Sequence, residues 1–280
     1  MSGADTGLVP VVILCGGRGT RMRQDDTDVP KPLVRIGDRP MLHEVMSTFA
    51  HYGHTEFVLA LGHRAEAIKS YFLHRSQLGS DFTIDFGTPA KVTYHSESPE
   101  RGWRVSCIDT GRDTCTATRV VRAAQYARGD RMMVTYADGI ADVDIAELMC
   151  FHRAHGRLGT ITAVRPPGRF GVLDVGPDGE VRSFEEKPAR SAEVINGGYM
   201  VFDRAAIDRY LEPHGDVMLE AGPLQEMAAD GQLMAYLHHG FWQPVDTPRE
   251  REHLERLWAT GHVPWRPDGE RRGHHAPATG

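Results

Sequence analysis

Apolar and polar positions follow two patterns along the chain: short apolar runs, and stretches with apolar residues every three or four positions. The runs are too short for helices and are bounded by glycine, proline or charged residues, so they predict buried strands over 9–15, 56–61, 131–136 and 159–164. The helical spacing predicts helices over 40–52, 65–73, 123–127 and 145–155. Strands and helices in alternation are typical of a parallel sheet with helices on both faces.

Shorter elements are predicted in the rest of the chain. Strands are predicted over 91–95, 170–175, 181–184, 197–202 and 233–238. Helices are predicted over 205–211, 223–230 and 249–260. Because no internal repeat or linker interrupts the pattern, we expect one domain over residues 1–266 with an α/β fold and a mixed, mostly parallel sheet. The hydrophobic pattern ends there, so residues 267–280 are predicted to be a disordered tail.

Composition narrows the classes of protein. Of the 280 residues, 40% are hydrophobic and 25% are charged, which is an ordinary balance for a globular protein. A net charge of −6 argues against a protein that coats nucleic acid. The few cysteines form no CxxC pair, which argues against a zinc ribbon and favours a cytoplasmic protein with reduced thiols. No apolar run reaches ~18 residues and the first residues lack a leader pattern, so we expect neither a membrane span nor a signal peptide.

A glycine-rich loop, GGRGTR from Gly16 to Arg21, follows the first predicted strand directly. Glycines in that place let backbone N–H groups approach a phosphate, and Arg18 and Arg21 can bind phosphate oxygens in pairs. A Walker A loop would need a lysine after the glycines, and a dinucleotide fingerprint fails at Met22, which argues against an oxidoreductase. A tight turn with surface arginines has the same pattern, so both interpretations stay open here.

Lys31 lies between two prolines, which hold it in a stiff extended segment. A rigid backbone suits a lysine that must bind a phosphate at a fixed position, although an exposed loop lysine would have the same sequence pattern.

Carboxylates follow two of the predicted strands. Asp138 follows the third strand at its carboxyl end, where open α/β sheets place their ligands, and it could hold Mg²⁺ or simply begin a turn. Asp246 could share that ion, or else it or Thr247 caps the last helix. Asp142 and Asp144 are expected to cap the helix that follows them. The histidines occur partly as adjacent pairs and in no HExxH motif, which argues against zinc.

These segments, taken in order, resemble the sugar-1-phosphate nucleotidyltransferase family. The broad family pattern lies in LCGGRGTR from Leu14 and in PKPL from Pro30. The resemblance continues in DTG from Asp109 with Thr114, Thr116 and Arg119, and in YADG, PPGRFG, EKP, NGG and GFWQPVDT further on. Among these, DTG, PPGRFG and GFWQPVDT indicate the cytidylyltransferase branch. The resemblance covers about residues 9–266 and implies a Rossmann-like three-layer nucleotidyltransferase fold.

The resemblance also implies an activity, which is Mg²⁺-dependent nucleotidyl transfer from CTP to glucose 1-phosphate by a homo-oligomer, giving CDP-glucose and pyrophosphate. It assigns catalysis to Arg21, Lys31, Asp138 and Lys187. It assigns nucleotide binding to Leu14, Cys15, Gly16, Gly17, Arg18, Gly19, Thr20, Thr114, Arg119 and Ala137. It assigns the sugar phosphate to Gly171, Glu186, Lys187 and Asn196, and Mg²⁺ to Asp138 and Asp246. A non-catalytic nucleotide-sugar sensor is the other class, and the joint presence of these residues argues against it.

Several positions depart from the pattern of that branch. Val29 replaces a lysine, Ala137 a glycine and Leu219 a tryptophan, and Ala117 and Thr118 replace two glycines. We expect the loop changes to bear on the choice of nucleotide and Leu219 to bear on the choice of sugar. The alternative is therefore the same chemistry with UTP or dTTP, or with another sugar or cyclitol 1-phosphate.

Overall fold

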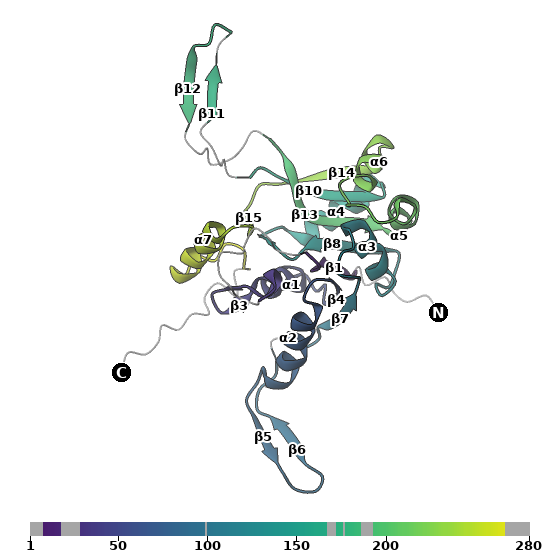
Figure 1. Ribbon diagram of the computed structural model, residues 1–280, viewed down its shortest axis with the longest axis vertical. Helices are drawn as coiled ribbons and strands as arrows, with labels where there is room; N and C mark the ends of the chain where they lie inside the picture. The colour runs from purple at the N-terminus through teal and green to yellow at the C-terminus, as the bar shows by residue number, and fades with distance from the viewer. Residues whose placement is uncertain are drawn as a thin grey trace.

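Figure 1 shows the computed structural model of the chain, which describes residues 8–17, 29–98, 100–166, 172–175, 177–185 and 193–266. Its central sheet has seven strands: β1 (Val11–Leu14), β4 (Glu56–Leu61), β7 (Arg104–Asp109), β8 (Arg131–Tyr136), β10 (Gly159–Val164), β13 (Ile195–Asp203) and β14 (Leu233–His238). Their order is β14-β10-β13-β8-β1-β4-β7. Four of the six pairings are parallel, whereas β13 runs antiparallel to both of its neighbours. The prediction of a mixed, mostly parallel sheet is confirmed.

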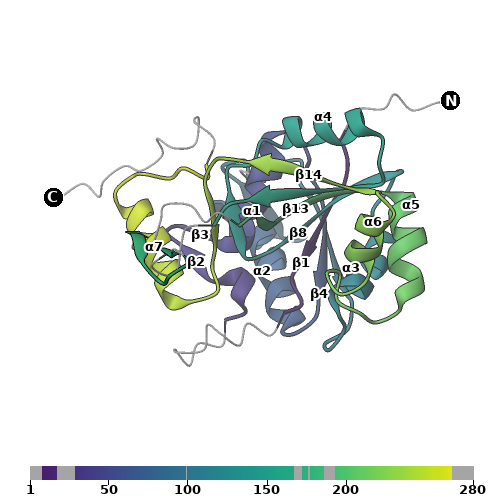
Figure 2. The ribbon, with the colours of Figure 1, turned by 90° about the horizontal axis from the view of Figure 1, so that it is seen from above.

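Helices cover both faces of this sheet (Figure 2). One face is covered by α1 (Met41–His51), α2 (Ala65–Leu78) and α4 (Ile145–His155). The other is covered by α3 (Thr116–Ala124), α5 (Arg204–Ala206), the π-helical turn η3 (Ile207–Leu211), followed by η4 (Glu212–His214), and α6 (Pro223–Ala229). Alternate side chains of each strand enter opposite cores: Val11 and Ile13 pack with α1, whereas Val12 and Leu14 pack with α3. This is the three-layer arrangement that the resemblance implies.

A third, smaller apolar cluster lies beside the sheet, where Ile36, Ile140, Val245, Leu254 and Trp265 pack together. Its residues come from β2 (Arg35–Ile36), β9 (Gly139–Ala141), α7 (Pro248–Ala259) and the segments next to them. Strand β2 follows η2 (Lys31–Leu33) and pairs with β3 (Arg39–Pro40), and β9 pairs with β15 (Trp242–Pro244). The cluster therefore packs segments far apart in the sequence against one another, next to the strand ends.

A buried ion pair anchors the end of the described chain to α1. The guanidinium of Arg266 donates to Glu44 Oε2 at 3.0 Å, and the indole of Trp265 donates to the same oxygen at 3.2 Å. Both Glu44 and Arg266 are almost fully buried. Because a buried charge is costly without a partner, the two side chains depend on each other.

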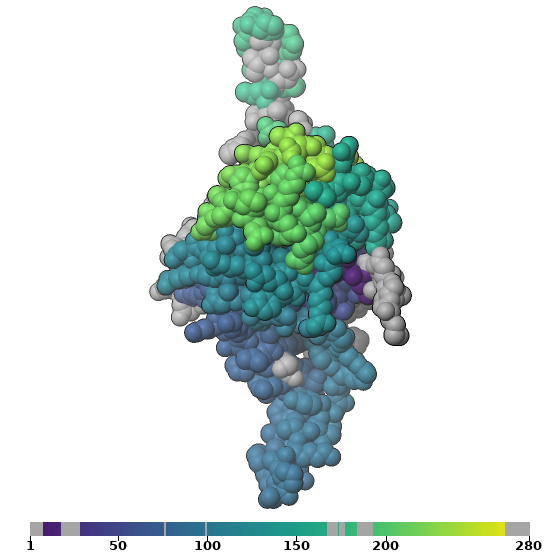
Figure 3. All heavy atoms as spheres, turned by 90° about the vertical axis from the view of Figure 1, so that its right-hand side faces the viewer, coloured from purple at the N-terminus to yellow at the C-terminus, as the bar shows by residue number. Residues whose placement is uncertain are grey.

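Two antiparallel hairpins project from opposite ends of the molecule (Figures 1 and 3). One pairs β5 (Phe82–Asp85) with β6 (Lys91–Tyr94), and the other pairs β11 (Val172–Val175) with β12 (Val181–Glu185). Every residue of β5 and β6 is exposed. None of the described helices is both long and apolar enough to span a membrane.

The bounds predicted for β4, β8, β10, β14 and α4 are confirmed. The helix predicted over 123–127 is wrong in extent, because α3 already begins at Thr116. Its start depends on a distant residue, since the backbone N–H of Cys115 donates to Asp216 at 2.8 Å. Strand β7 was not predicted, and its sequence RVSCID forms an edge strand by pairing with β4. The single domain over 1–266 stays a prediction, and the tail at 267–280 lies outside the described residues.

Candidate active site

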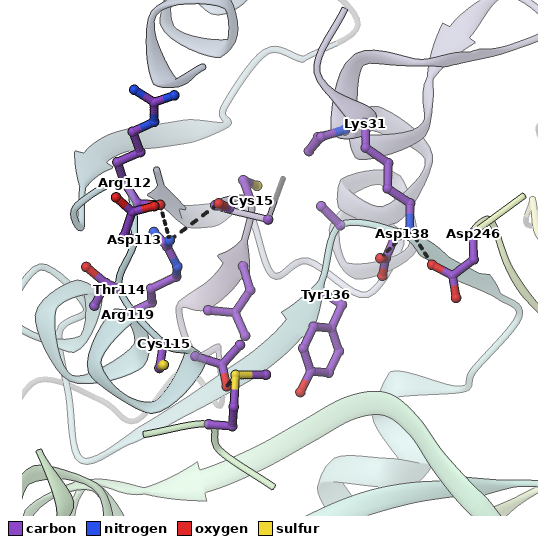
Figure 4. Close-up of a pocket in the computed structure, with 17 residues that line it drawn as sticks. Cys15, Lys31, Arg112, Asp113, Thr114, Cys115, Arg119, Tyr136, Asp138 and Asp246 are labelled. Carbon is purple, nitrogen blue, oxygen red and sulfur yellow. Dashed lines mark hydrogen bonds and ion pairs between the residues drawn. The ribbon is translucent and has the colours of Figure 1, made fainter. Parts of the chain in front are cut away.

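A cavity of about 720 Å³ opens at the carboxyl ends of β1 and β8 (Figure 4). Its volume is suited to a ligand of nucleotide size, and its position is the one that open α/β sheets use for ligands. Its lining comprises Leu14, Cys15, Gly16, Gly17, Lys31, Pro32, Arg112, Asp113, Thr114, Cys115, Thr116, Arg119, Tyr136, Ala137, Asp138, Met218 and Asp246. All the predicted nucleotide-binding residues that the structure describes are in this lining.

One side of the cavity brings three charged side chains together. The ammonium of Lys31 donates to Asp138 Oδ2 at 2.7 Å and to Asp246 Oδ1 at 2.6 Å (Figure 4). The Lys31 side chain is 12% exposed, so it meets the carboxylates largely away from water. Burial alone would lower the pKa of Lys31, but the two carboxylates outweigh it and raise that pKa, which keeps the ammonium charged.

A short antiparallel ribbon brings the two carboxylates to this place. Strand β9 begins directly after Asp138, and β15 ends shortly before Asp246. The strands pair with each other, and the backbone N–H of Val245 donates to the Asp138 carbonyl at 2.9 Å. Thr247 caps α7 in a capping box with Glu250. The cap is therefore Thr247, and the carboxylate of Asp246 points instead to Lys31.

The Asp138 and Asp246 pair fits a magnesium ion. Both carboxylates already converge on one cationic atom, the nitrogen of Lys31. Mg²⁺ is commonly bound by one or two carboxylates, with water and phosphate oxygens as the remaining ligands. Over the parts of the chain that the structure describes, no group of three or more His, Cys, Asp or Glu side chains is placed to hold a metal. Any ion here would therefore draw its other ligands from water and substrate.

Arg119 forms the opposite side of the cavity and is only 4% exposed. Its guanidinium donates to Thr110 Oγ1 at 2.8 Å and to the carbonyls of Gly111 (2.7 Å), Leu61 (3.0 Å), Arg112 (3.2 Å) and Gly16 (3.3 Å). A Cβ on Gly16 would lie 2.2 Å from the Arg119 Cζ, and one on Gly62 would lie 2.3 Å from an Arg119 nitrogen. Arg119 therefore ties together the ends of three strands, and its contact with nucleotide stays a prediction.

A second, smaller cavity of about 250 Å³ adjoins the first. It shares Tyr136, Asp138 and Asp246 with the large cavity, so the two carboxylates lie on the boundary between them. Asn196 lines it, as predicted for a sugar-phosphate residue, and accepts from the backbone N–H of Gly198 at 2.8 Å. Trp242 lines it too, and its indole donates to the Gly197 carbonyl at 2.8 Å.

The remaining predicted site residues lie outside the described part of the chain. These are Arg18, Gly19, Thr20, Arg21, Gly171, Glu186 and Lys187. Their roles stay predictions.

Several residues of the site were not predicted. Tyr136 borders both cavities, and its phenol donates to the carboxylate of Glu220. Burial, and then the charge of Glu220, raise the pKa of Tyr136, so the phenol stays protonated. Its place in YADG, just before Asp138, was a usable signal. No sequence signal pointed to Met218, because it reaches the cavity from a distant segment.

The departures from the branch pattern have different consequences in the structure. Ala137 lines the large cavity. Ala117, in α3, and Leu219 are by contrast fully buried, and Leu219 packs in the core with α3 and α6. The hydroxyl of Thr118 donates to the Gly215 carbonyl at 3.0 Å. Leu219 can thus affect a substrate only through its neighbours, whereas Ala137 can touch one directly.

Comparison with known sequences places most of the chain in one family. The sequence model of the nucleotidyl transferase family matches residues 10–250. The chain is 40% identical over 256 residues to the glucose-1-phosphate cytidylyltransferase of Salmonella typhi, an alignment that covers 91% of this chain and 98% of the relative. It is 38% identical over 255 residues to the probable glucose-1-phosphate cytidylyltransferase of Bacillus subtilis, with the same coverage of 91% and 98%. The mannose-1-phosphate guanyltransferase of Neurospora crassa is more distant, at 31% over 245 residues, 85% of this chain and 61% of that protein.

Solved structures share the fold. HddC from Yersinia pseudotuberculosis, complexed with GMP-PN, superposes with a TM-score of 0.63 at 20% identity, covering 90% of this chain and 100% of that one. A putative glucose-1-phosphate thymidylyltransferase from Bacillus anthracis gives 0.61 at 19% identity, covering 89% and 94%. These likenesses bear on the fold, and the sequence match spans most of the chain. The chain belongs to the nucleotidyl transferase family, and within it to the sugar-1-phosphate nucleotidyltransferases.

Proposed function

We propose that this enzyme transfers a cytidylyl group from CTP to glucose 1-phosphate in a Mg²⁺-dependent reaction, giving CDP-glucose and pyrophosphate. The observation that supports this most directly is the meeting of Lys31, Asp138 and Asp246 on the boundary between two cavities. The larger cavity suits a nucleoside triphosphate and the smaller one a sugar phosphate. The names of the relatives at 40% and 38% identity support CTP and glucose 1-phosphate as the substrates.

The reaction needs cations and alignment more than it needs a nucleophile on the protein. A phosphate oxygen of glucose 1-phosphate attacks the α-phosphorus of CTP, and the bond from that phosphorus to the bridging oxygen of the β-phosphate breaks. Pyrophosphate leaves with the electron pair. Both reactants are anions that repel each other, so positive charge and a fixed geometry lower the barrier. No general base is required, because a phosphate monoester dianion is already nucleophilic.

Each part of the site has a place in this scheme. Backbone N–H groups at Gly16 and Gly17 would meet the phosphates of the nucleotide. The ammonium of Lys31 would bind phosphate oxygens at the boundary of the cavities. Asp138 and Asp246 would hold Mg²⁺, which supplies positive charge next to the phosphate oxygens and the leaving group. By resemblance, Arg21 would hold the departing pyrophosphate and Lys187 the attacking phosphate.

The second candidate keeps the chemistry and changes a substrate. Ala137 lines the large cavity at a position where the branch pattern has glycine, so its methyl group is the described change most able to alter the choice of nucleotide. UTP or dTTP in place of CTP, or another sugar or cyclitol 1-phosphate, is the alternative. A cytoplasmic location and a homo-oligomeric state also stay predictions.

A pyrophosphate-release assay tests the proposal. The full chain is incubated with Mg²⁺ and glucose 1-phosphate, and with CTP, UTP, dTTP, ATP and GTP in separate reactions. We expect a strong preference for CTP, with release that requires the sugar phosphate. Equal or faster release with another nucleotide would replace CTP in the proposal. If CTP releases pyrophosphate only when a different sugar phosphate is supplied, that sugar phosphate would replace glucose 1-phosphate in the proposal.

A further inference from the structure

The ribbon of β9 and β15 is the structural link between the two carboxylates of the site. In its register Gly139 pairs with Pro244 and Ala141 pairs with Trp242. Asp138 and Asp246 flank the same end of this ribbon. A two-stranded ribbon this short is marginal by itself, so its register depends on what closes its ends and covers its face.

Asp142 closes the other end of the ribbon. Its carboxylate accepts from the backbone N–H of Phe241 at 2.6 Å, and its own backbone N–H donates to the Phe241 carbonyl at 3.1 Å. The same carboxylate oxygen lies 3.1 Å from Nε2 of His238, a side chain that is 8% exposed. Asp142, directly after β9, thus contacts Phe241 just before β15 and His238 at the end of β14.

The glycine of this turn fits that arrangement. A Cβ on Gly240 would lie 2.2 Å from the Asp142 carboxylate oxygen, so no larger residue fits there without moving the carboxylate. The sequence pattern predicts that Asp142 and Asp144 both cap α4. The prediction holds for Asp144, which accepts from the backbone N–H of Glu147 at 2.8 Å, but it is wrong for Asp142.

We propose that Asp142 is a positioning residue that sets the relative placement of Asp138 and Asp246 through the ribbon. It touches neither cavity, and it acts at the far end of the two strands that join the carboxylates. For its effect on Mg²⁺, the proposal rests on the proposed function. Residues that orient metal ligands commonly change metal affinity by about 10–100-fold when they are removed.

The test compares Asp142→Ala with Asp144→Ala, a matched loss of a carboxylate two positions along the chain. Three quantities are measured on the full chain: amide hydrogen exchange, binding of Mn²⁺ alone by electron paramagnetic resonance, and the Mg²⁺ concentration for half-maximal turnover. For Asp142→Ala we expect faster exchange over 239–246, weaker Mn²⁺ binding and a Mg²⁺ requirement raised about tenfold. For Asp144→Ala we expect faster exchange only in the first turns of α4, with unchanged metal dependence.

Two further variants keep the test independent of a general loss of structure. Asp142→Asn retains an oxygen that accepts from Phe241 and should stay within about twofold of wild type in metal dependence. Gly240→Ala disturbs the same contact from the other side and should behave like Asp142→Ala.

Wild-type metal dependence in Asp142→Ala would overturn the inference, and so would an equal shift in Asp144→Ala. If the wild type releases no pyrophosphate from CTP and glucose 1-phosphate, the proposed function fails by itself. Hydrogen exchange and Mn²⁺ binding then still decide the inference. Wild-type values of both in Asp142→Ala would overturn it.

Discussion

Replacing Arg119 by methionine should destabilise the protein strongly even when no ligand is present. Methionine keeps much of the side-chain volume but removes the charged donors. The guanidinium donates to acceptors at the carboxyl ends of three strands, β1, β4 and β7. Removing the guanidinium leaves these acceptor oxygens without its hydrogen bonds, in a region where Leu61 and Thr110 are fully buried.

The size of the effect follows from what each acceptor retains. The Leu61 carbonyl still accepts from the backbone N–H of Thr110 at 2.9 Å and from its hydroxyl at 2.6 Å, and the Gly16 carbonyl still accepts from His63 at 3.3 Å. The loss is therefore smaller than five independent hydrogen bonds. A buried acceptor left unpaired costs about 1–3 kcal/mol, so the loss at the acceptors that keep no other donor sums to about 3–5 kcal/mol. At roughly 2–4 °C per kcal/mol for a chain near this size, Tm should fall by about 6–20 °C.

Scanning calorimetry at one scan rate, without nucleotide, measures this change. Arg122→Met is the matched control, because Arg122 lies on the same helix and donates to the Thr110 carbonyl at 2.7 Å but is exposed. Its loss should cost only about 1 kcal/mol. If Arg119→Met melts no lower than this control, the structural role is refuted. A raised KM for CTP with an unchanged Tm would instead favour direct contact between Arg119 and the nucleotide.

Four further predictions concern other parts of the molecule. Asp138→Asn should lower kcat by at least about 100-fold in the pyrophosphate-release assay, because a carboxylate proposed to hold Mg²⁺ loses its charge; near-normal turnover would contradict the proposal. Lys187→Ala should raise the KM for the sugar phosphate far more than that for CTP, and equal effects would place Lys187 elsewhere. Gly16→Ala should lower Tm by several degrees, because the added Cβ would clash with the Arg119 guanidinium. An unchanged Tm would show that the guanidinium can move aside without cost. Burial raises the pKa of Glu100, but hydrogen bonds from a histidine, a serine and an arginine outweigh it and hold that pKa well below its usual range. Glu100 therefore stabilises the fold above about pH 4–5, and this contribution is lost as the pH falls. Between pH 7 and pH 3 the Tm of Glu100→Gln should fall by less than the Tm of wild type. An equal fall of Tm in both proteins would contradict this.

Local pattern was sufficient for much of the fold. Strands β4, β8 and β10 are short apolar runs bounded by polar residues or glycine, and a buried strand needs no more information than that. The glycine loop at Gly16 and the carboxylate at Asp138 were also predictable, because each directly follows a predicted strand. Where a sheet binds ligands depends on strand ends, and strand ends are local features of a sequence.

Only the tertiary structure decided which of these residues meet. Lys31 lies 107 positions from Asp138 and 215 positions from Asp246. The pairing of β9 with β15 and the packing of η2 on α1 bring the three together. The resemblance assigns Arg119 to nucleotide binding, and only the structure shows that its guanidinium also donates to Thr110 and to backbone carbonyls at three strand ends. Asp142 and Asp144 look alike as helix caps, and the pairing of β9 with β15 gives Asp142 a different partner. Sequence periodicity states which face of an element is buried, but contacts between distant segments depend on how the layers pack, and a local pattern contains no record of that.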